Sequence, residues 1–324
     1  SSDVCSSDLE EAEKVDFPLL YKENGAKMKS KNEQRFQMGA NLAMALVALI
    51  MVIPFILLVM SSLTSNTEIT LHGYTFFPKE FSLEAYQYIW NERTQIFKAY
   101  GITILVTILG TAVGLCLTIL YAYALSQPAF PGKTFFAFYL FFTMLFNGGL
   151  VPTYIMYTRY LHIKNTLWAL IIPGLLMSAF NVILVRTFLQ NNVPLSLLEA
   201  ARIDGAGEFK IFRKVVLPLA KPIIATVGLF IGVAYWNDWT NGLYYVTDAK
   251  LFSVQQMLNN MLKNIEYLSQ NPNSQINTSN MAASIPQASV RMAIALVGIL
   301  PILVIYPFVQ KYFVKGIAIG AVKG

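Results

Sequence analysis

Six apolar blocks dominate the sequence, and each is long enough to cross a lipid bilayer as a helix. The hydrocarbon core needs roughly 20 helical residues, with a range of about 17–25. The central part of every block lacks Asp, Glu, Lys, Arg and His. We therefore expect an all-α integral membrane protein with six transmembrane helices. The predicted spans are 42–60, 102–125, 135–157, 167–185, 222–241 and 292–309.

Composition supports a membrane protein. Charged residues make up 13% of the 324-residue chain, whereas soluble domains carry about 25%. Three prolines, Pro54, Pro173 and Pro301, lie inside predicted spans, where neighbouring helices can satisfy the backbone groups that they free. The net charge of +6 is more typical of basic loops that set orientation than of nucleic-acid binding. We expect a lipid environment and no nucleic-acid partner.

The distribution of Lys and Arg predicts the orientation. Sixteen of the 24 lie before the first span, between the second and third, around residues 186–221, or after the last span. Basic residues concentrate on the cytoplasmic side of membrane proteins. We therefore expect both termini, and the polar segment between the fourth and fifth spans, to be cytoplasmic.

The first 27 residues differ from the rest. They are acidic and rich in serine, and they lack the apolar region of a signal peptide. We expect them to be a disordered or non-native extension, with one transmembrane domain at 28–324. The two cysteines, Cys5 and Cys116, offer no disulfide framework. The lone histidines His72 and His162 fall in polar loops, and we expect no metal site.

What the spans lack narrows the mechanism. Ion-coupled carriers and pumps usually keep an ionisable group at mid-membrane, and these spans have none. The chain also lacks a GxxxxGK[ST] nucleotide-binding loop. Uphill transport would therefore need energy from another polypeptide. The alternative is a self-sufficient secondary carrier or another polytopic membrane protein, such as an intramembrane enzyme.

A polar segment, EAARIDGAGEFKIFRKVVLP at 199–218, lies between the fourth and fifth spans. We predict a helix over 197–204, because Ser196 and Glu199 have the spacing of a capping box. Gly205 can take the left-handed conformation that ends helices.

A second helix is expected over 208–216, with Phe209, Phe212 and Val216 along one side and Pro218 at its end. The two helices would form a stiff hairpin. Such a hairpin either docks into a partner protein or lies on the lipid headgroups, and both interpretations stay open on physical grounds.

The pattern of this segment resembles the EAA motif of ABC-importer permease subunits. Glu199-Ala200-Ala201, three residues, Gly205, nine residues, and Val215-x-Leu217-Pro218 follow its spacing, with Val in place of the usual Ile. The segments NGGLVPTYI, YWNDW and KYFVKGIAIGAVKG are also similar to the carbohydrate-uptake branch, the maltose-type second permease and its oligosaccharide-importing relatives. The resemblance runs from residue 28 to 324.

The resemblance implies a transport subunit of the bacterial cell membrane, with no catalysis and no cofactor of its own. It implies a second permease subunit as heterodimer partner, two cytoplasmic ATPase subunits that bind ATP and Mg²⁺, an extracytoplasmic sugar-binding protein, and a sugar or oligosaccharide substrate. The hairpin would be the coupling helix that docks on an ATPase. Its implied docking residues are Glu199, Ala200, Ala201, Asp204, Gly205, Val215, Leu217 and Pro218.

Relatives' C-terminal tails also reach the ATPase pair. The matching residues here are Lys315, Gly316, Gly320 and Lys323. The alternative is a frayed basic end. On the outer side, the resemblance implies that the polar stretch 244–289 touches the binding protein. That stretch could instead pack only on its own subunit.

Aromatic and amide side chains near two span ends have the chemistry that binds sugars. An aromatic belt at the headgroups explains the same residues equally well, and the partner permease could hold the sugar alone. The candidate substrate path consists of Asn147, Trp236, Asn237, Asp238 and Trp239.

Overall fold

The computed structural model describes residues 31–270 and 287–321. Over these ranges the secondary structure is helical, with one isolated β-bridge between Thr64 and Phe81. The prediction of an all-α chain is confirmed. The expected extension at 1–27 lies outside the described residues, as does Lys323. The chain forms two compact units, Ser1–Leu57 and Leu58–Gly324, and each is described by itself.

The first unit contains most of helix α3, Lys31–Ser62. Between residues 36 and 56, apolar side chains are exposed on every side of this helix. A helix that is apolar all round needs lipid or protein around it. The described helix covers the predicted first span at 42–60, and Pro54 lies within it.

The second unit begins with the short helices α4 (Asn66–His72) and α5 (Glu84–Asn91), followed by the long helix α6 (Arg93–Ser126). Helix α6 packs along α10 (Ala179–Asn192) and α14 (Lys221–Trp236). Small residues allow the close approach. A Cβ at Gly110 would meet two ring carbons of Tyr235 at 2.6 and 2.7 Å, so glycine is needed there.

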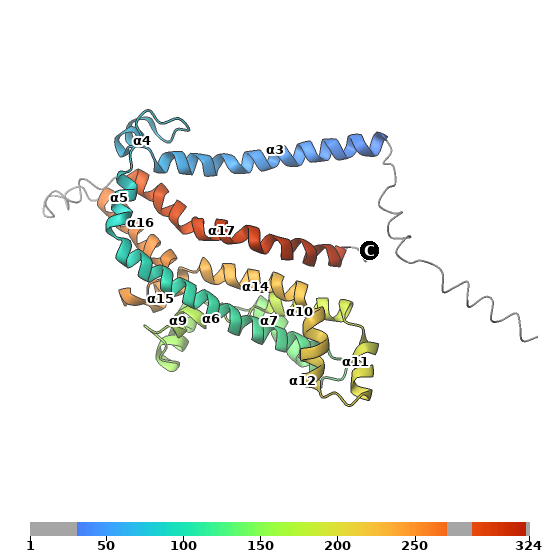
Figure 1. The fold of residues 1–324 in the computed structure, drawn as a ribbon. Coiled ribbons are helices and arrows are strands. Elements are labelled where there is room, and N and C mark those ends of the chain that lie inside the picture. The colour runs from blue at the N-terminus through green and yellow to red at the C-terminus, as the bar shows by residue number, and fades with distance from the viewer. Residues whose placement is uncertain (1–30, 271–286, 322–324) are drawn as a thin grey trace, which may run out of the picture. The chain divides into compact units, whose positions relative to one another are not determined.

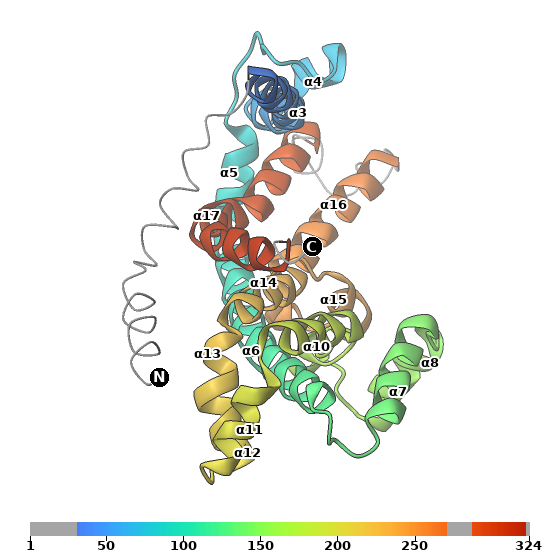
Figure 2. The same cartoon turned by 90° about the vertical axis from the view of Figure 1, so that its right-hand side faces the viewer.

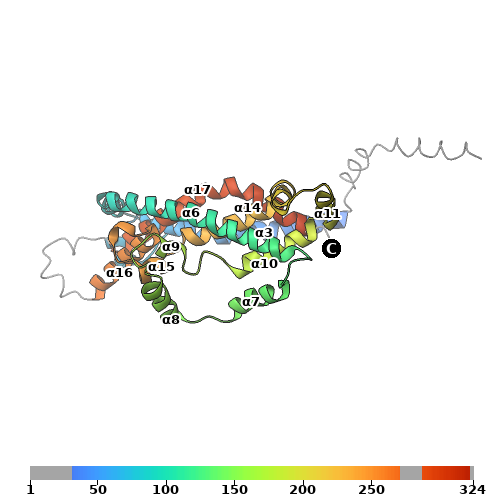
Figure 3. The ribbon, with the colours of Figure 1, turned by 90° about the horizontal axis from the view of Figure 1, so that it is seen from below.

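The predicted third span is a bent pair of helices. Helix α7 (Lys133–Leu145) and the segment Leu150–Tyr160 meet at 114°; that segment comprises α8 (Leu150–Ile155) and the π turn η1 (Met156–Tyr160). The expectation of one continuous helix over 135–157 was wrong because Gly149 adopts φ +83°, which an α-helix cannot contain. Figures 2 and 3 show α7 and α8 on one side of the unit, away from α17 (Gln287–Ala321).

The predicted fourth span, 167–185, is also interrupted. Helix α9 (Trp168–Ile171) ends before Pro173 and Gly174, and α10 begins only at Ala179 and runs on to Asn192. Gly174 has φ +70°. The sequence reasoning missed this break by treating the apolar run as one helix.

The carbonyls freed at this break bond to neighbouring segments. The Tyr235 hydroxyl donates to the Ile171 carbonyl at 2.8 Å, and Asn241 Nδ2 donates to the Pro173 carbonyl at 2.9 Å.

The last part of the chain runs through α14, α15 (Thr240–Tyr245), the 3₁₀ turn η3 (Ala249–Leu251), α16 (Val254–Gln270) and α17. Helix α14 stops at Trp236, short of the predicted span end at 241. Helix α17 covers the predicted sixth span and includes Pro301 and Pro307.

By length and composition, two helices of the described residues could cross a bilayer alone, at 35–62 and 93–126. The bent pairs at 133–160 and 208–236 could each supply one more span. We assign the membrane part of the second pair to α14, because its first arm carries four charged residues. The count of six spans stays a prediction.

The second unit has two distinct ends. In Figure 1, the short helices α11 (Leu195–Ile203) and α12 (Glu208–Ile211) lie at one end of α6 and α14, and α15 and α16 lie at the other. The C-terminal end of α17 points to the same end as α11 in Figures 1 and 3. The two ends therefore carry the two groups of candidate residues.

Candidate functional site

Helix α11 forms the first arm of a hairpin, and its end has a precise geometry. Gly205 adopts φ +74°, as predicted. The Ala206 amide donates to the Ala201 carbonyl, and the Gly205 amide donates to the Arg202 carbonyl, both at 3.0 Å. This pair of bonds is the Schellman arrangement, which satisfies the last carbonyls of a helix. The turn is therefore fixed by its own backbone.

The start of the first arm differs from the prediction. Helix α11 begins at Leu195, with Pro194 at the N-cap and no side-chain cap. The predicted capping box of Ser196 and Glu199 is absent because Ser196 lies inside the helix rather than before it.

The second arm consists of α12, the π turn η2 (Phe212–Val216) and α13 (Leu217–Leu219). Pro218 does not end it: the arm continues to Leu219 and then bends by 82° into α14. The π turn contains the residue whose carbonyl would pair with position 218 in an α-helix, so the missing proline N–H falls where the α-helical bonding is already altered.

The apolar side of this arm was predicted only in part. Phe212 and Val216 are buried as expected, but Phe209 is 74% exposed and Ile211 takes the inward position. The sequence spacing was read as an even helical stripe. Phe209, in the first turn of α12, lies on the exposed side instead.

The motif residues divide into two groups. Glu199, Ala200, Asp204, Gly205 and Pro218 are exposed. The other three motif residues are half-buried and pack against the hydrophobic core: Ala201, Val215 and Leu217.

Two apolar side chains that the sequence reasoning did not assign to docking complete the exposed surface of the hairpin. Ile203 is 86% exposed and Phe209 is 74% exposed. Large apolar groups beside an exposed polar edge are typical of a protein-contact surface. Their position next to the motif in the sequence is the signal by which these two residues could have been predicted to take part in docking.

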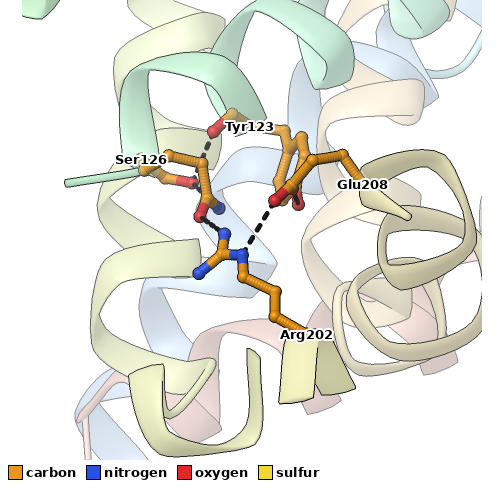
Figure 4. A network of polar contacts seen from close by, with 5 residues as sticks. Tyr123, Ser126, Arg202 and Glu208 are labelled. Atoms are coloured by element: carbon orange, nitrogen blue, oxygen red, sulfur yellow. Dashed lines mark hydrogen bonds and ion pairs between the residues drawn. The ribbon is translucent and has the colours of Figure 1, made fainter. Parts of the chain in front are cut away.

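A polar network closes the hairpin and joins it to the end of α6 (Figure 4). Arg202 Nε donates to Glu208 Oε1 at 2.8 Å, and Arg202 Nη2 donates to Gln127 Oε1 at 2.9 Å. The Tyr123 hydroxyl donates to Glu208 Oε2 at 2.9 Å. The rings of Tyr123 and Phe212 lie 5.0 Å apart. The two arms and α6 are thus held by charge-assisted bonds and ring packing.

The ionised form of Glu208 is favoured by these bonds. The hydrogen bond from Arg202 is the main cause that holds the pKa of Glu208 below its ordinary value, and the bond from Tyr123 acts in the same direction. The carboxylate that closes the hairpin is therefore negatively charged at neutral pH.

The other group of candidates lies at the opposite end, after α14. Trp236 is buried, and its Nε1 has no hydrogen-bond partner among the described residues. Asp238 Oδ1 accepts from the amides of Thr240 and Asn241, at 3.1 and 3.2 Å. Asp238 therefore caps the start of α15, a local role that the sequence reasoning did not foresee.

Asn237 and Trp239 line a cavity of about 290 Å³ together with residues of α16 and α17. Asn147 lies elsewhere in the fold. It lies in the break between α7 and α8, where its Oδ1 accepts from the Gly149 amide at 2.8 Å. The structure thus brings Asn237 and Trp239 to one cavity and gives Asn147 a role in a turn.

The backbone of the predicted tail is helical through Ala321, and it includes Lys315, Gly316 and Gly320. Contact of these residues with an ATPase stays a prediction.

Long apolar helices, two bent helix pairs and an exposed helical hairpin define a helical membrane protein. Comparison with known families is specific: the model of the binding-protein-dependent transport system inner membrane component matches residues 35–319. The chain belongs to this family.

Individual relatives agree. The chain is 38% identical over 277 residues to the polygalacturonan/rhamnogalacturonan transport system permease protein YtcP of Bacillus subtilis (strain 168), a match that covers 86% of this chain and 94% of YtcP. It is 36% identical to protein LplC of the same organism, with 86% and 91% covered. A solved bacterial ABC transporter involved in the import of the acidic polysaccharide alginate matches with 29% identity and a TM-score of 0.72, covering 89% of this chain and 100% of the matched chain.

Proposed function

We propose that this chain is a permease subunit of an ATP-driven importer of oligosaccharides, and that the α11–α13 hairpin docks on a separate ATPase. One observation carries the docking proposal. Glu199, Ala200 and Gly205 are exposed on a backbone-fixed turn, beside the exposed apolar side chains of Ile203 and Phe209. A rigid, partly apolar projection of this kind suits a groove on a partner protein.

The connections of the hairpin suggest how it would act. It follows α10 directly, leads into α14, and is bonded to α6 through Tyr123 and Gln127. A movement imposed on its tip would reach all three helices together. Transport then requires that the ATPase favour one of two discrete arrangements when it binds nucleotide.

The same proposal includes the orientation of the chain in the membrane and the proteins that it binds. The hairpin end, towards which α17 also points, would face the cytoplasm and two ATPase subunits that hold ATP and Mg²⁺. The end with α15 and α16 would face a sugar-binding protein. A second permease subunit would complete the pathway, with six spans in this chain and both termini inside the bacterial cell.

For the substrate we propose an acidic oligosaccharide. The relatives described above include a transporter of polygalacturonan and rhamnogalacturonan and a transporter of alginate. These are polymers with carboxylated sugars. Their similarity to this chain extends over most of its length. This supports the same class of substrate for this chain.

A Gly205→Glu substitution tests the docking. The variant should stay in the membrane but lose ATPase association and uptake, because a bulky charge and a strained left-handed residue would occupy the turn. Gly73→Glu is the matched control: Gly73 also has φ +76° and open space around it, but it ends α4. Full uptake and full ATPase association in Gly205→Glu would refute the proposed docking.

A further inference from the structure

We propose that the cavity between the end of α14, α16 and α17 is a subsite for one carboxylated sugar residue of the substrate. Trp239 would provide the stacking face, amides from α14 and α16 would bind hydroxyl groups, and Lys263 would pair with the carboxylate. This inference rests on the proposed function, and it names residues of α16 to which the sequence assigned no part in binding the sugar.

The cavity has a suitable size and wall. Its volume is about 290 Å³, at the lower limit of ligand pockets, which start at about 300 Å³. Leu258 and Ile294 form apolar parts of the wall, and Trp239 lines the cavity with 42% of its surface exposed. A sugar ring presents C–H groups on one face and hydroxyls at its edge. An aromatic face beside apolar walls suits the first of these.

Close packing of α16 on α17 shapes this wall. A Cβ at Gly298 would lie 3.0 Å from Leu258 Cδ1 and 3.8 Å from Gln255 Nε2. The absence of a side chain at position 298 therefore leaves room for Leu258 on the cavity wall, with the Gln255 amide at ordinary contact distance.

Three amides line the cavity: Asn237, Gln255 and Asn259. Asn237 Nδ2 donates to the Val233 carbonyl at 3.1 Å, so its Oδ1 is the atom suited to accept from a sugar hydroxyl. Asn259 Nδ2 is buried without a hydrogen-bond partner among the described residues. A buried donor left unsatisfied costs free energy, and a small turn of this amide towards a bound hydroxyl would remove that cost.

A positively charged side chain lies next to Trp239, one of the residues of the cavity wall. Lys263 Nζ lies 6.0 Å from the centre of the Trp239 ring, within the range of a cation–π contact. Gln255, Asn259 and Lys263 follow one another at intervals of four residues, which places them along one face of α16. The neighbouring carboxylate of Asp238 is bonded to the amides that start α15. A carboxylated sugar stacked on Trp239 would therefore meet an ammonium group at its edge.

The experiment uses the complete transporter in vesicles, with its binding protein and ATPases, and measures uptake of galacturonic acid trimer and of a neutral pentose trimer. Lys263→Gln should raise the KM for the acidic trimer about tenfold, the effect of losing roughly 1.4 kcal/mol, and leave the neutral KM unchanged. Asn259→Ala should raise the KM for any sugar that enters. Lys250→Gln and Asn264→Ala, exposed positions outside the cavity wall, should change neither.

The outcomes separate two failures. If the unchanged transporter imports the acidic trimer and Lys263→Gln has the same KM, the subsite is refuted and the proposed function stands. An equal rise for acidic and neutral sugars would also refute it, because that result indicates contact with the binding protein. If the unchanged transporter imports no oligosaccharide while its ATPases are active, the proposed function itself fails.

Discussion

Arg202 Nε lies 2.8 Å from Glu208 Oε1, and this contact joins the end of α11 to the start of α12 across the turn of the hairpin. Both partners also reach α6, Arg202 through Gln127 and Glu208 through Tyr123. The pair therefore connects the two arms of the hairpin, which are neighbours in the sequence, to residues 75 and 85 positions earlier at the end of α6. Its contribution to folding is expected to be small, because both side chains are well exposed. Its value lies in fixing geometry.

Removing this ion pair should weaken the coupling of ATP hydrolysis to sugar import, while the protein stays folded. Glu208→Gln should lower the amount of sugar imported per ATP hydrolysed, while the stability changes by less than about 1 kcal/mol, the usual limit for exposed pairs. Uptake and ATPase rates in vesicles give this ratio. The exchanged pair Arg202→Glu with Glu208→Arg should recover part of it. A ratio equal to that of the unchanged protein in Glu208→Gln would show that the pair plays no part in coupling.

The same carboxylate should make the hairpin sensitive to acid. Because the pKa of Glu208 is lowered in the folded state, its contribution is complete above the unfolded value of about 4.3 and is lost as the pH falls through the lower folded value. Hydrogen exchange at residues 204–208 should therefore accelerate in that acidic window. Glu208→Gln should show fast exchange at every pH, once the intrinsic pH effect is subtracted. Identical profiles for the two proteins would contradict the assignment.

The exposed ring of Phe209 should matter for docking alone. Phe209→Ala should weaken binding of the ATPase by tenfold or more, about 1.4 kcal/mol, as expected of an aromatic anchor. Its stability should change by no more than about 0.5 kcal/mol, because the ring is largely in solvent. Phe77→Ala, at an 87% exposed ring outside the hairpin, is the control. The measurement is ATPase binding to the purified permease in detergent.

The close packing of α6 on α14 should leave no room for a side chain at position 110. Gly110→Ala should destabilise the protein by about 1–3 kcal/mol, the usual cost of overpacking, because the new methyl group would overlap the Tyr235 ring. Gly101→Ala on the same helix meets nothing within 4 Å and should be neutral or stabilising. Thermal unfolding in detergent compares the two. Equal melting temperatures would contradict the close contact.

A buried carboxylate should hold the loop after α4. Glu68 accepts from the backbone amides of Lys79 and Glu80, at 2.8 and 2.7 Å, and these bonds are the main causes that lower the pKa of Glu68. Glu68→Ala should expose the segment between α4 and α5 to proteases, and Glu68→Gln should protect it partly because one acceptor remains. Glu84→Ala, at an exposed residue, should leave the digestion pattern unchanged.

The sequence predicted the features that depend on local chemistry. The apolar blocks gave the all-α class, and Gly205 gave the left-handed turn, because glycine at the end of a short helix has few other roles. The resemblance to the EAA motif implied docking at Glu199 and Ala200, and both are exposed. These positions are fixed by their immediate neighbours in the chain.

Other features depend on contacts that are distant in the sequence. Apolar composition at 167–185 hides a break whose carbonyls are satisfied by Tyr235 and Asn241. The cavity at Trp239 likewise needs α16 and α17, and the bond from Arg202 to Gln127 spans 75 positions. A hydropathy profile cannot show such pairings, because it reports only the local polarity of the sequence and not which distant residues meet in the fold.

The break at residues 172–178 separates the short helix α9 from α10. The segment before it is anchored by the Tyr235 and Asn241 bonds, while α10 beyond it carries the hairpin at its far end. If the ATPase docks on the hairpin as proposed, a movement of the hairpin would pass to α10 and α14 together. The bond from Tyr235 on α14 to the Ile171 carbonyl would then carry it across the break to α9.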